Sequence, residues 1–135
     1  MSSAIEQYKM VSLQATIRNA NAYKVIQTLM GNALDKIGKA IFFINENKTA
    51  EKGLQISLAI TTLDALQASL DLDKGGEIAA NLSALYNYMV DKLVIANINN
   101  DIKILNEIRG LLNTIKSGWD GIEEEAKRFL NTDRS

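Results

Sequence analysis

Residues 77–98 read EIAANLSALYNYMVDKLVIANI, and their apolar side chains are spaced as in an amphipathic helix. The spacing alternates between three and four residues, which places these side chains on one face of a helix. The predicted core face of this helix consists of Ile78, Leu82, Leu85, Met89, Leu93 and Ala96. Asn99 and Asn100 end the pattern, and Asn100 is a residue type that favours the cap of a following helix.

The same spacing recurs on both sides of this stretch, over residues 23–44, 50–70 and 101–122. The connections hold six residues or fewer, and Gly75 and Gly76 suit the reversal before residue 77. Short connections make successive helices antiparallel neighbours. The sequence therefore predicts an all-α fold, an antiparallel up-down four-helix bundle over residues 23–122.

The length of 135 residues predicts one domain, residues 1–135. Residues 1–20 are expected to form a mobile N-terminal segment or short helix packed on the bundle, and residues 123–135 a polar tail. Proline, the strongest helix breaker, is absent from the chain. Without a proline to forbid helix upstream, the start of the first long helix stays open, and it can lie as early as about Asn19.

The composition argues against an enzyme. Histidine and cysteine are both absent, which removes most catalytic and metal-binding constellations, so we expect no catalytic residue, cofactor or metal site. The 15 Lys and Arg residues nearly balance 16 Asp and Glu residues, which disfavours a nucleic-acid partner. The longest apolar run is too short to cross a bilayer and the first residues lack a signal-peptide pattern, so a cytoplasmic protein without membrane insertion is expected.

The helices carry more apolar residues than a bundle core requires. Some of this surplus completes ordinary wide core faces, and the remainder would form an exposed apolar surface for a partner. The N-terminal segment would cover that surface when no partner is bound. The predicted partner-binding residues are Ile5, Tyr8, Val11, Leu54, Leu58, Ala65, Leu72, Tyr86, Val90, Val94, Ile104 and Leu111.

Two motifs in the third stretch give a family resemblance. The sequence LDLDKGGEIAANL at residues 70–82, followed by LYNYM at residues 85–89, closely resembles the flagellin export chaperones, the FliS family. The resemblance covers about residues 5–122, and its other matching positions are Ile5, Tyr8, Val11, Leu13, Leu93, Ala96, Asn97, Leu111, Leu112 and Trp119.

This resemblance implies a helical bundle that binds the disordered C-terminal segment of flagellin, prevents early filament polymerisation and aids delivery to the flagellar type III export gate. It also implies that Ile5 and Tyr8 belong to a segment used in self-capping and in docking at the gate. Which groove between helices holds the client stays open at this point. A different class remains as the alternative, a structural adaptor that self-associates through its apolar grooves, and a weak homodimer is compatible with either.

Overall fold

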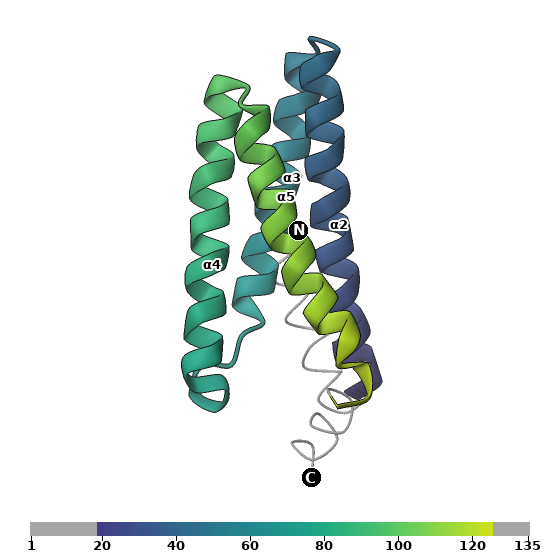
Figure 1. The fold of residues 1–135 in the computed structure, drawn as a ribbon, viewed down its shortest axis with the longest axis vertical. Helices are drawn as coiled ribbons and strands as arrows, with labels where there is room; N and C mark the ends of the chain where they lie inside the picture. The colour runs from purple at the N-terminus through teal and green to yellow at the C-terminus, as the bar shows by residue number, and fades with distance from the viewer. Residues whose placement is uncertain (1–18, 126–135) are drawn as a thin grey trace, which may run out of the picture.

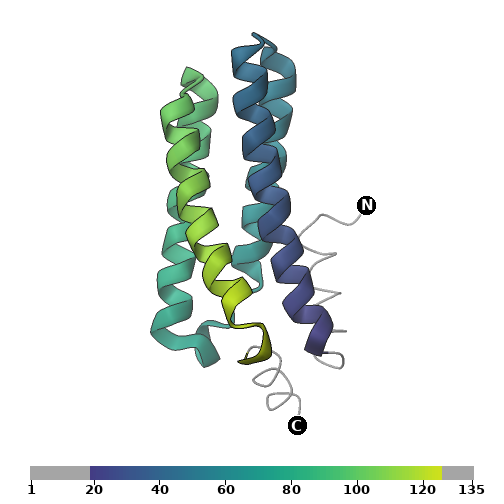
Figure 2. The same ribbon diagram turned by 45° about the vertical axis from the view of Figure 1, so that its right-hand side comes forward.

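The computed structural model describes residues 19–125, which form four long helices joined by short turns. The helices are α2 (Asn19–Asn45), α3 (Thr49–Ala68), α4 (Leu72–Asn99) and α5 (Ile102–Gly121). Each helix contacts the next along the chain, and α5 closes the ring against α2. Figures 1 and 2 show an antiparallel bundle in which the α2–α3 pair lies beside the α4–α5 pair. The predicted all-α bundle is confirmed over these residues.

The core follows the three-and-four spacing of the sequence in all four helices. Each helix contributes buried residues at this interval, and together they form one continuous cluster. The cluster consists of Met30, Ala33, Ile37, Ala40, Ile56, Ala59, Leu63, Leu66, Tyr86, Met89, Leu93, Ala96, Leu105, Ile108 and Leu112. The apolar spacing predicted over residues 23–44, 50–70 and 101–122 is reproduced in the buried residues of α2, α3 and α5, whereas the face of α4 differs, as described below.

The start of α4 differs from the prediction. The helix was expected to begin at residue 77, but α4 begins at Leu72, and the side chain of Asp71 caps it by accepting a hydrogen bond from Lys74 N (3.0 Å). Gly76 interrupts the helix with φ 52° and ψ −129°, a backbone conformation that essentially only glycine adopts. Gly76 therefore produces a kink inside α4, and the glycine pair does not form the connection before the helix.

The turn between α4 and α5 also differs by one residue from the prediction. Asn100 has the left-handed conformation (φ 51°) and ends α4, so it is not the N-cap of the next helix. That role belongs to Asp101, whose carboxylate accepts hydrogen bonds from the amides of Lys103 (3.0 Å) and Ile104 (3.2 Å). Asparagine tolerates the left-handed conformation, which explains why it suits this position.

Candidate protein-binding surface

Helix α4 carries most of the large apolar side chains that the described residues expose. Of eleven such side chains, seven lie on α4, and the others are Phe42, Leu54, Leu58 and Ile122. The exposed set on α4 is Leu72, Ile78, Leu85, Tyr88, Val94, Ile95 and Ile98. Isolated exposed apolar residues are normal on a protein surface, but a concentration on one element marks a candidate interface.

The apolar stripe of α4 is only half covered. Met89 and Leu93 are fully buried, as predicted, but Ile78 is 74% exposed and Leu85 is 37% exposed. The predicted core role of Ile78 and Leu85 is therefore wrong. Tyr86 takes the core position in the same turn as Leu85, because residues 86, 89, 93 and 96 keep the three-and-four spacing.

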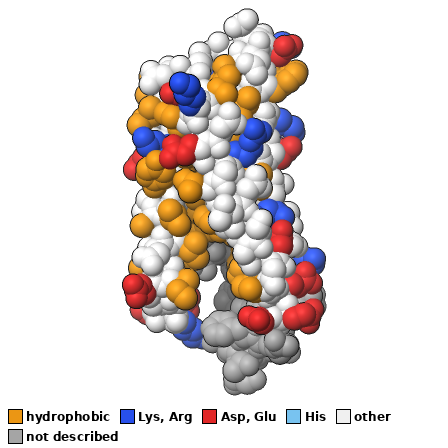
Figure 3. Space-filling view, in the orientation of Figure 1, with side chains coloured by type: hydrophobic (Ala, Val, Ile, Leu, Met, Phe, Trp, Pro, Cys, Tyr) orange, Lys and Arg blue, Asp and Glu red, His pale blue; other side chains and the backbone are white. Residues whose placement is uncertain are grey.

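The uncovered half of the stripe forms one wall of a groove between α4 and α5. The space-filling view shows a hollow between the lower halves of these helices, with apolar atoms on both sides (Figure 3). By "lower" we mean the end of the bundle that holds the start of α2 and the end of α5. The side chains along this seam are exposed or only partly buried. We define the α4–α5 groove as Ile78, Leu82, Leu85, Leu111 and Ile115.

The lower end of α5 is tied to the start of α2. Tyr23 and Trp119 stack with ring centroids 4.9 Å apart. Tyr23 Oη donates to Trp119 O (2.7 Å), and Trp119 Nε1 donates to Tyr23 O (3.2 Å). A further hydrogen bond joins Gln27 Nε2 to Asp120 Oδ1 (2.8 Å). These contacts hold the end of α5 against the start of α2, so α4 and α5 diverge downward (Figure 1).

A polar bridge joins α4 and α5 above the groove. Tyr88 Oη donates to Glu107 Oε2 (2.6 Å), and Lys92 Nζ lies 5.7 Å from the centroid of the Tyr88 ring. The hydrogen bond to Glu107, together with partial burial and the negative charge of Glu107, raises the pKa of Tyr88 above its usual value. The bridge marks the level at which the two helices come together.

The predicted partner-binding residues divide into four groups. Leu54, Leu58, Leu72 and Val94 are exposed, as a contact surface requires. Val90, Ile104 and Leu111 are half-buried and pack against the core. Ala65 and Tyr86 are buried, with 0% and 2% exposure. Ile5, Tyr8 and Val11 lie outside the described residues.

Two of these assignments therefore need correction. Tyr86 was placed on an outward stripe, but its spacing to Met89 and Leu93 brings it into the core cluster. Ala65 is likewise fully buried, so it presents no surface to a partner. An apolar residue beside a predicted core stripe can be interior or exterior, and the spacing within a single helix does not distinguish the two.

The remaining predicted residues do not share one surface. Leu111 lines the α4–α5 groove, and Ile104 is on the same side of α5. Val90 and Val94 lie on the side of α4 that faces α3. Two hydrogen bonds from α3 mark this side of the helix. Gln67 Nε2 donates to Ser83 Oγ (3.0 Å), and Lys52 Nζ donates to Asn97 O (2.7 Å).

Sequence reasoning missed the residues that make the surface distinctive. Ile78 and Leu85 were assigned to the core, and Ile95 and Ile98 were not selected, although they are 41% and 74% exposed. The kink at Gly76 and the divergence of α5 are tertiary features. The only local signal was the excess of apolar residues in residues 77–98.

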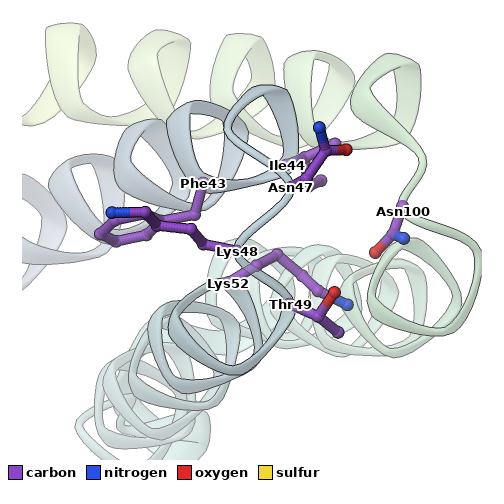
Figure 4. A pocket seen from close by; sticks show the side chains of 7 residues that line it. All are labelled: Phe43, Ile44, Asn47, Lys48, Thr49, Lys52 and Asn100. Atoms are coloured by element: carbon purple, nitrogen blue, oxygen red, sulfur yellow. The ribbon is translucent and has the colours of Figure 1, made fainter.

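A small polar pocket lies at the opposite end of the bundle (Figure 4). It has a volume of ≈ 70 Å³ and is lined by Phe43, Ile44, Asn47, Lys48, Thr49, Lys52 and Asn100. The buried Lys52 donates from Nζ to Asn97 O (2.7 Å), near the C-terminus of α4, where a positive charge is favourable. The hydrogen bond to Asn97 O therefore explains why Lys52 is buried, and it gives Lys52 a structural role at this end of the bundle.

Residues 19–125 contain neither a candidate metal-ion site nor a membrane-spanning helix. No group of three or more acidic side chains there is arranged to hold a metal ion. None of the four helices has a stretch long and apolar enough to cross a membrane.

The fold and the uncovered apolar stripe define the class of the protein as an all-α helical bundle with a candidate surface for another protein chain. Comparison with known proteins gives the family. The family model described as "Flagellar protein FliS" matches residues 4–126, so the chain belongs to the FliS family, a family of chaperones and not of enzymes.

Individual relatives support the same family. The chain is 42% identical to the flagellar secretion chaperone FliSB of Pseudomonas aeruginosa, over 88% of this chain and 94% of that protein. It is 38% identical to the flagellar secretion chaperone FliS of Salmonella typhimurium, over 92% and 93% of the two chains. Identity to the flagellar secretion chaperone FliS of Vibrio cholerae is 30%, over 93% and 92%. The family therefore supports a role as a flagellar secretion chaperone.

Proposed function

We propose that the chain is a cytoplasmic export chaperone that binds the disordered C-terminal segment of flagellin. In this role it prevents premature polymerisation of the filament protein and delivers it to the flagellar type III export gate. The observation that carries the proposal is the half-covered apolar stripe of α4, where Ile78 and Leu85 are exposed beside the α4–α5 groove. Membership of the FliS family supports the same function.

The physical requirement for such a client is a long apolar surface. A disordered segment loses conformational entropy when it is ordered on a partner, so it must bury substantial apolar area in return. The α4–α5 groove provides two apolar walls, and a groove between helices suits the apolar face of an amphipathic helix. Binding of this kind requires no nucleotide, because the client is released by transfer to another binding protein.

Calorimetric titration with a peptide from the C-terminal segment of flagellin tests this function. We expect a dissociation constant at or below the order of micromolar and a negative heat-capacity change, since apolar area is buried. A peptide of equal length from the N-terminal part of flagellin serves as the control. Absence of detectable binding at micromolar concentrations would overturn the proposal.

A second candidate function is self-association as a structural adaptor. Val94, Ile95 and Ile98 favour it, because they expose an apolar patch on the upper part of α4, away from the groove. Analytical ultracentrifugation over a wide concentration range separates the two functions. A monomer, or a weak dimer that dissociates on dilution, is expected of the chaperone, whereas an obligate oligomer would favour the adaptor.

A further inference from the structure

The α5 wall of the α4–α5 groove has a gap at Gly118. Gly118 follows Glu107 by eleven residues and Leu111 by seven, which places it on the same side of α5 as both. This side faces α4, because Glu107 accepts the hydrogen bond from Tyr88. Gly118 is exposed, and a Cβ added to it would meet no neighbouring group among the described residues within 4 Å. The α5 wall therefore carries no side chain at this position.

Ile78 of α4 lies at the height of this gap. The hydrogen bond between Tyr88 and Glu107 (2.6 Å) sets the register of the two antiparallel helices. Ile78 lies ten residues below Tyr88 on α4, and Gly118 lies eleven residues below Glu107 on α5, so each is about 15–17 Å from the bridge along its helix axis. Ile78 is 74% exposed, as expected of an apolar residue whose facing helix carries no side chain at that height.

The surroundings of the gap are apolar. Leu82 and Ile115, which lie about one turn above Ile78 and Gly118, are half-buried and line the groove from its two sides. We define the Gly118 site as Ile78, Leu82, Ile115 and Gly118. A side chain inserted there contacts apolar groups of both helices, and the gain in free energy grows with the apolar area that is buried. The site therefore favours a bulky aliphatic or aromatic side chain over a small one.

The rim of the Gly118 site is acidic. Asp73 and Glu77 are exposed at the start of α4, and Glu124 and Glu125 are exposed just after α5, against the single lysine Lys74 in the same stretch of α4. The space-filling view shows acidic side chains at the lower end of the bundle on both sides of the hollow (Figure 3). A segment that carries a basic residue next to its apolar side chain complements this rim.

We propose that the Gly118 site is an anchor site that receives one bulky apolar side chain of the bound segment, with a basic residue beside it against the acidic rim. This inference rests on the proposed function, because the client supplies both groups. The absence of a side chain at residue 118 keeps the site open, since a larger residue there would cover Ile78 from within the chain. A single buried anchor commonly contributes much of the binding energy of an interface, so the site also fixes the register of the client in the groove.

Thermal denaturation of the full chain tests the open space without any client. Gly118→Leu should raise the Tm by about 3 °C more than Gly118→Ala does, because leucine covers Ile78 whereas both variants remove the helical glycine. The matched control is Gly110, which lies two residues from both Ile108 and Leu112 and hence on the outer side of α5. Gly110→Leu and Gly110→Ala should differ by less than about 1 °C.

A double-mutant cycle identifies the side chain that the leucine covers. In an Ile78→Ala background the difference between Gly118→Leu and Gly118→Ala should fall to about 1 °C or less, because the apolar contact is removed. An equal difference with and without Ile78, or equal values at residues 118 and 110, would overturn the proposal. Neither result depends on flagellin.

Calorimetric titration with the C-terminal flagellin peptide tests the occupant. Gly118→Leu should weaken binding at least about tenfold and Gly118→Ala less than about twofold, because only leucine fills the site. One bulky apolar residue of the peptide, changed to alanine, should weaken binding to the wild-type chain but not to Gly118→Leu. If no peptide residue shows this coupling, or if Gly118→Leu binds as the wild type does, the anchor site is overturned while the proposed function stands. A failure of the proposed function differs, since the wild-type chain itself would then not bind the peptide.

Charge reversal tests the acidic rim in the same titration. Asp73→Lys with Glu77→Lys should weaken binding about three- to tenfold at low salt, and this loss should shrink at high salt. Glu51→Lys with Asp91→Lys makes the same change at exposed positions away from the site and should alter affinity less than about twofold. An equal effect of the two reversals would contradict a basic residue of the client at the rim.

Discussion

Tyr23 and Trp119 set the shape of the lower half of the bundle. Their rings stack, and each side chain donates a hydrogen bond to the main-chain carbonyl of the other residue. The pair thereby fixes the end of α5 on the start of α2 across 96 residues of sequence. The three-and-four spacing of apolar residues in α5 includes Trp119, but the partner of its indole ring is a feature of the tertiary structure.

Replacement of Trp119 tests this anchoring role. Trp119→Ala should lower the free energy of unfolding by about 3 kcal/mol, because the stacked ring and its hydrogen bond are both lost. Trp119→Phe keeps an aromatic ring and should cost only about 1 kcal/mol for the lost donor. Urea denaturation followed by circular dichroism measures both values. A loss below about 1 kcal/mol for Trp119→Ala would show that the pair does not anchor α5.

Tyr88 should lose its proton at a higher pH than an ordinary tyrosine. Its hydrogen bond to Glu107 favours the protonated phenol and raises its pKa, so the bond contributes stability below the pKa of the unfolded chain, about 10. This contribution is lost as the pH rises through the higher pKa of the folded state. The difference in absorbance at 295 nm between wild type and Tyr88→Phe isolates its titration. Glu107→Gln should move the pKa back toward its usual value, and an unchanged curve would contradict the bridge.

At the scale of the element, α4 is the helix whose buried face and start were not predicted correctly from the sequence. For α2, α3 and α5 the spacing of apolar residues predicted the buried face, because each helix is packed by neighbours along its length. In α4, both Leu85 and Tyr86 fit a core stripe that continues to Met89, and the structure buries Tyr86 and leaves Leu85 exposed. The positive φ of Gly76 was anticipated from its residue type, but its place inside the helix was not.

The kink at Gly76 can be tested by comparing alanine substitution at Gly76 with alanine substitution at a glycine inside a regular helix. Gly76→Ala should destabilise the protein by about 1–2 kcal/mol, because alanine at φ 52° is strained. Gly110→Ala in α5 is the control, since an added Cβ there meets nothing within 4 Å and should stabilise the helix by about 0.5–1 kcal/mol. Thermal denaturation of the two variants gives the comparison. If Gly76→Ala is as stabilising as Gly110→Ala, α4 is straight at its start.

At the scale of the whole molecule, packing is distributed unevenly among the helices. The contacts between α2 and α3 are the most extensive, and those between α4 and α5 are the least extensive of the neighbouring pairs. The uneven packing follows from the divergence of α5, and the groove proposed to hold the client lies at the least extensively packed seam between neighbouring helices. A sequence can indicate that a helix carries more apolar residues than the core requires, but it does not show which pair of neighbouring helices is packed least extensively.

Hydrogen exchange should reflect this uneven packing. Amides of residues 79–85 in α4 are expected to exchange at least about tenfold faster than those of residues 30–40 in α2, because local opening is easiest where few apolar contacts must break. Mass spectrometry of exchanged peptides measures the two rates under native conditions. Equal protection of the two segments would contradict the description of α4 and α5 as the loosest pair.

The most direct test of the central claim is the affinity of groove variants for the C-terminal flagellin peptide. Ile78→Asp with Leu85→Asp should weaken binding at least about tenfold while the helical circular dichroism spectrum is retained, because both side chains are exposed in the groove. Ala80→Asp with Asn87→Asp adds the same charge at other exposed positions of α4 and should change affinity less than about twofold. Wild-type affinity in the groove variant, or an equal loss in both variants, would contradict the claim that the α4–α5 groove holds the client.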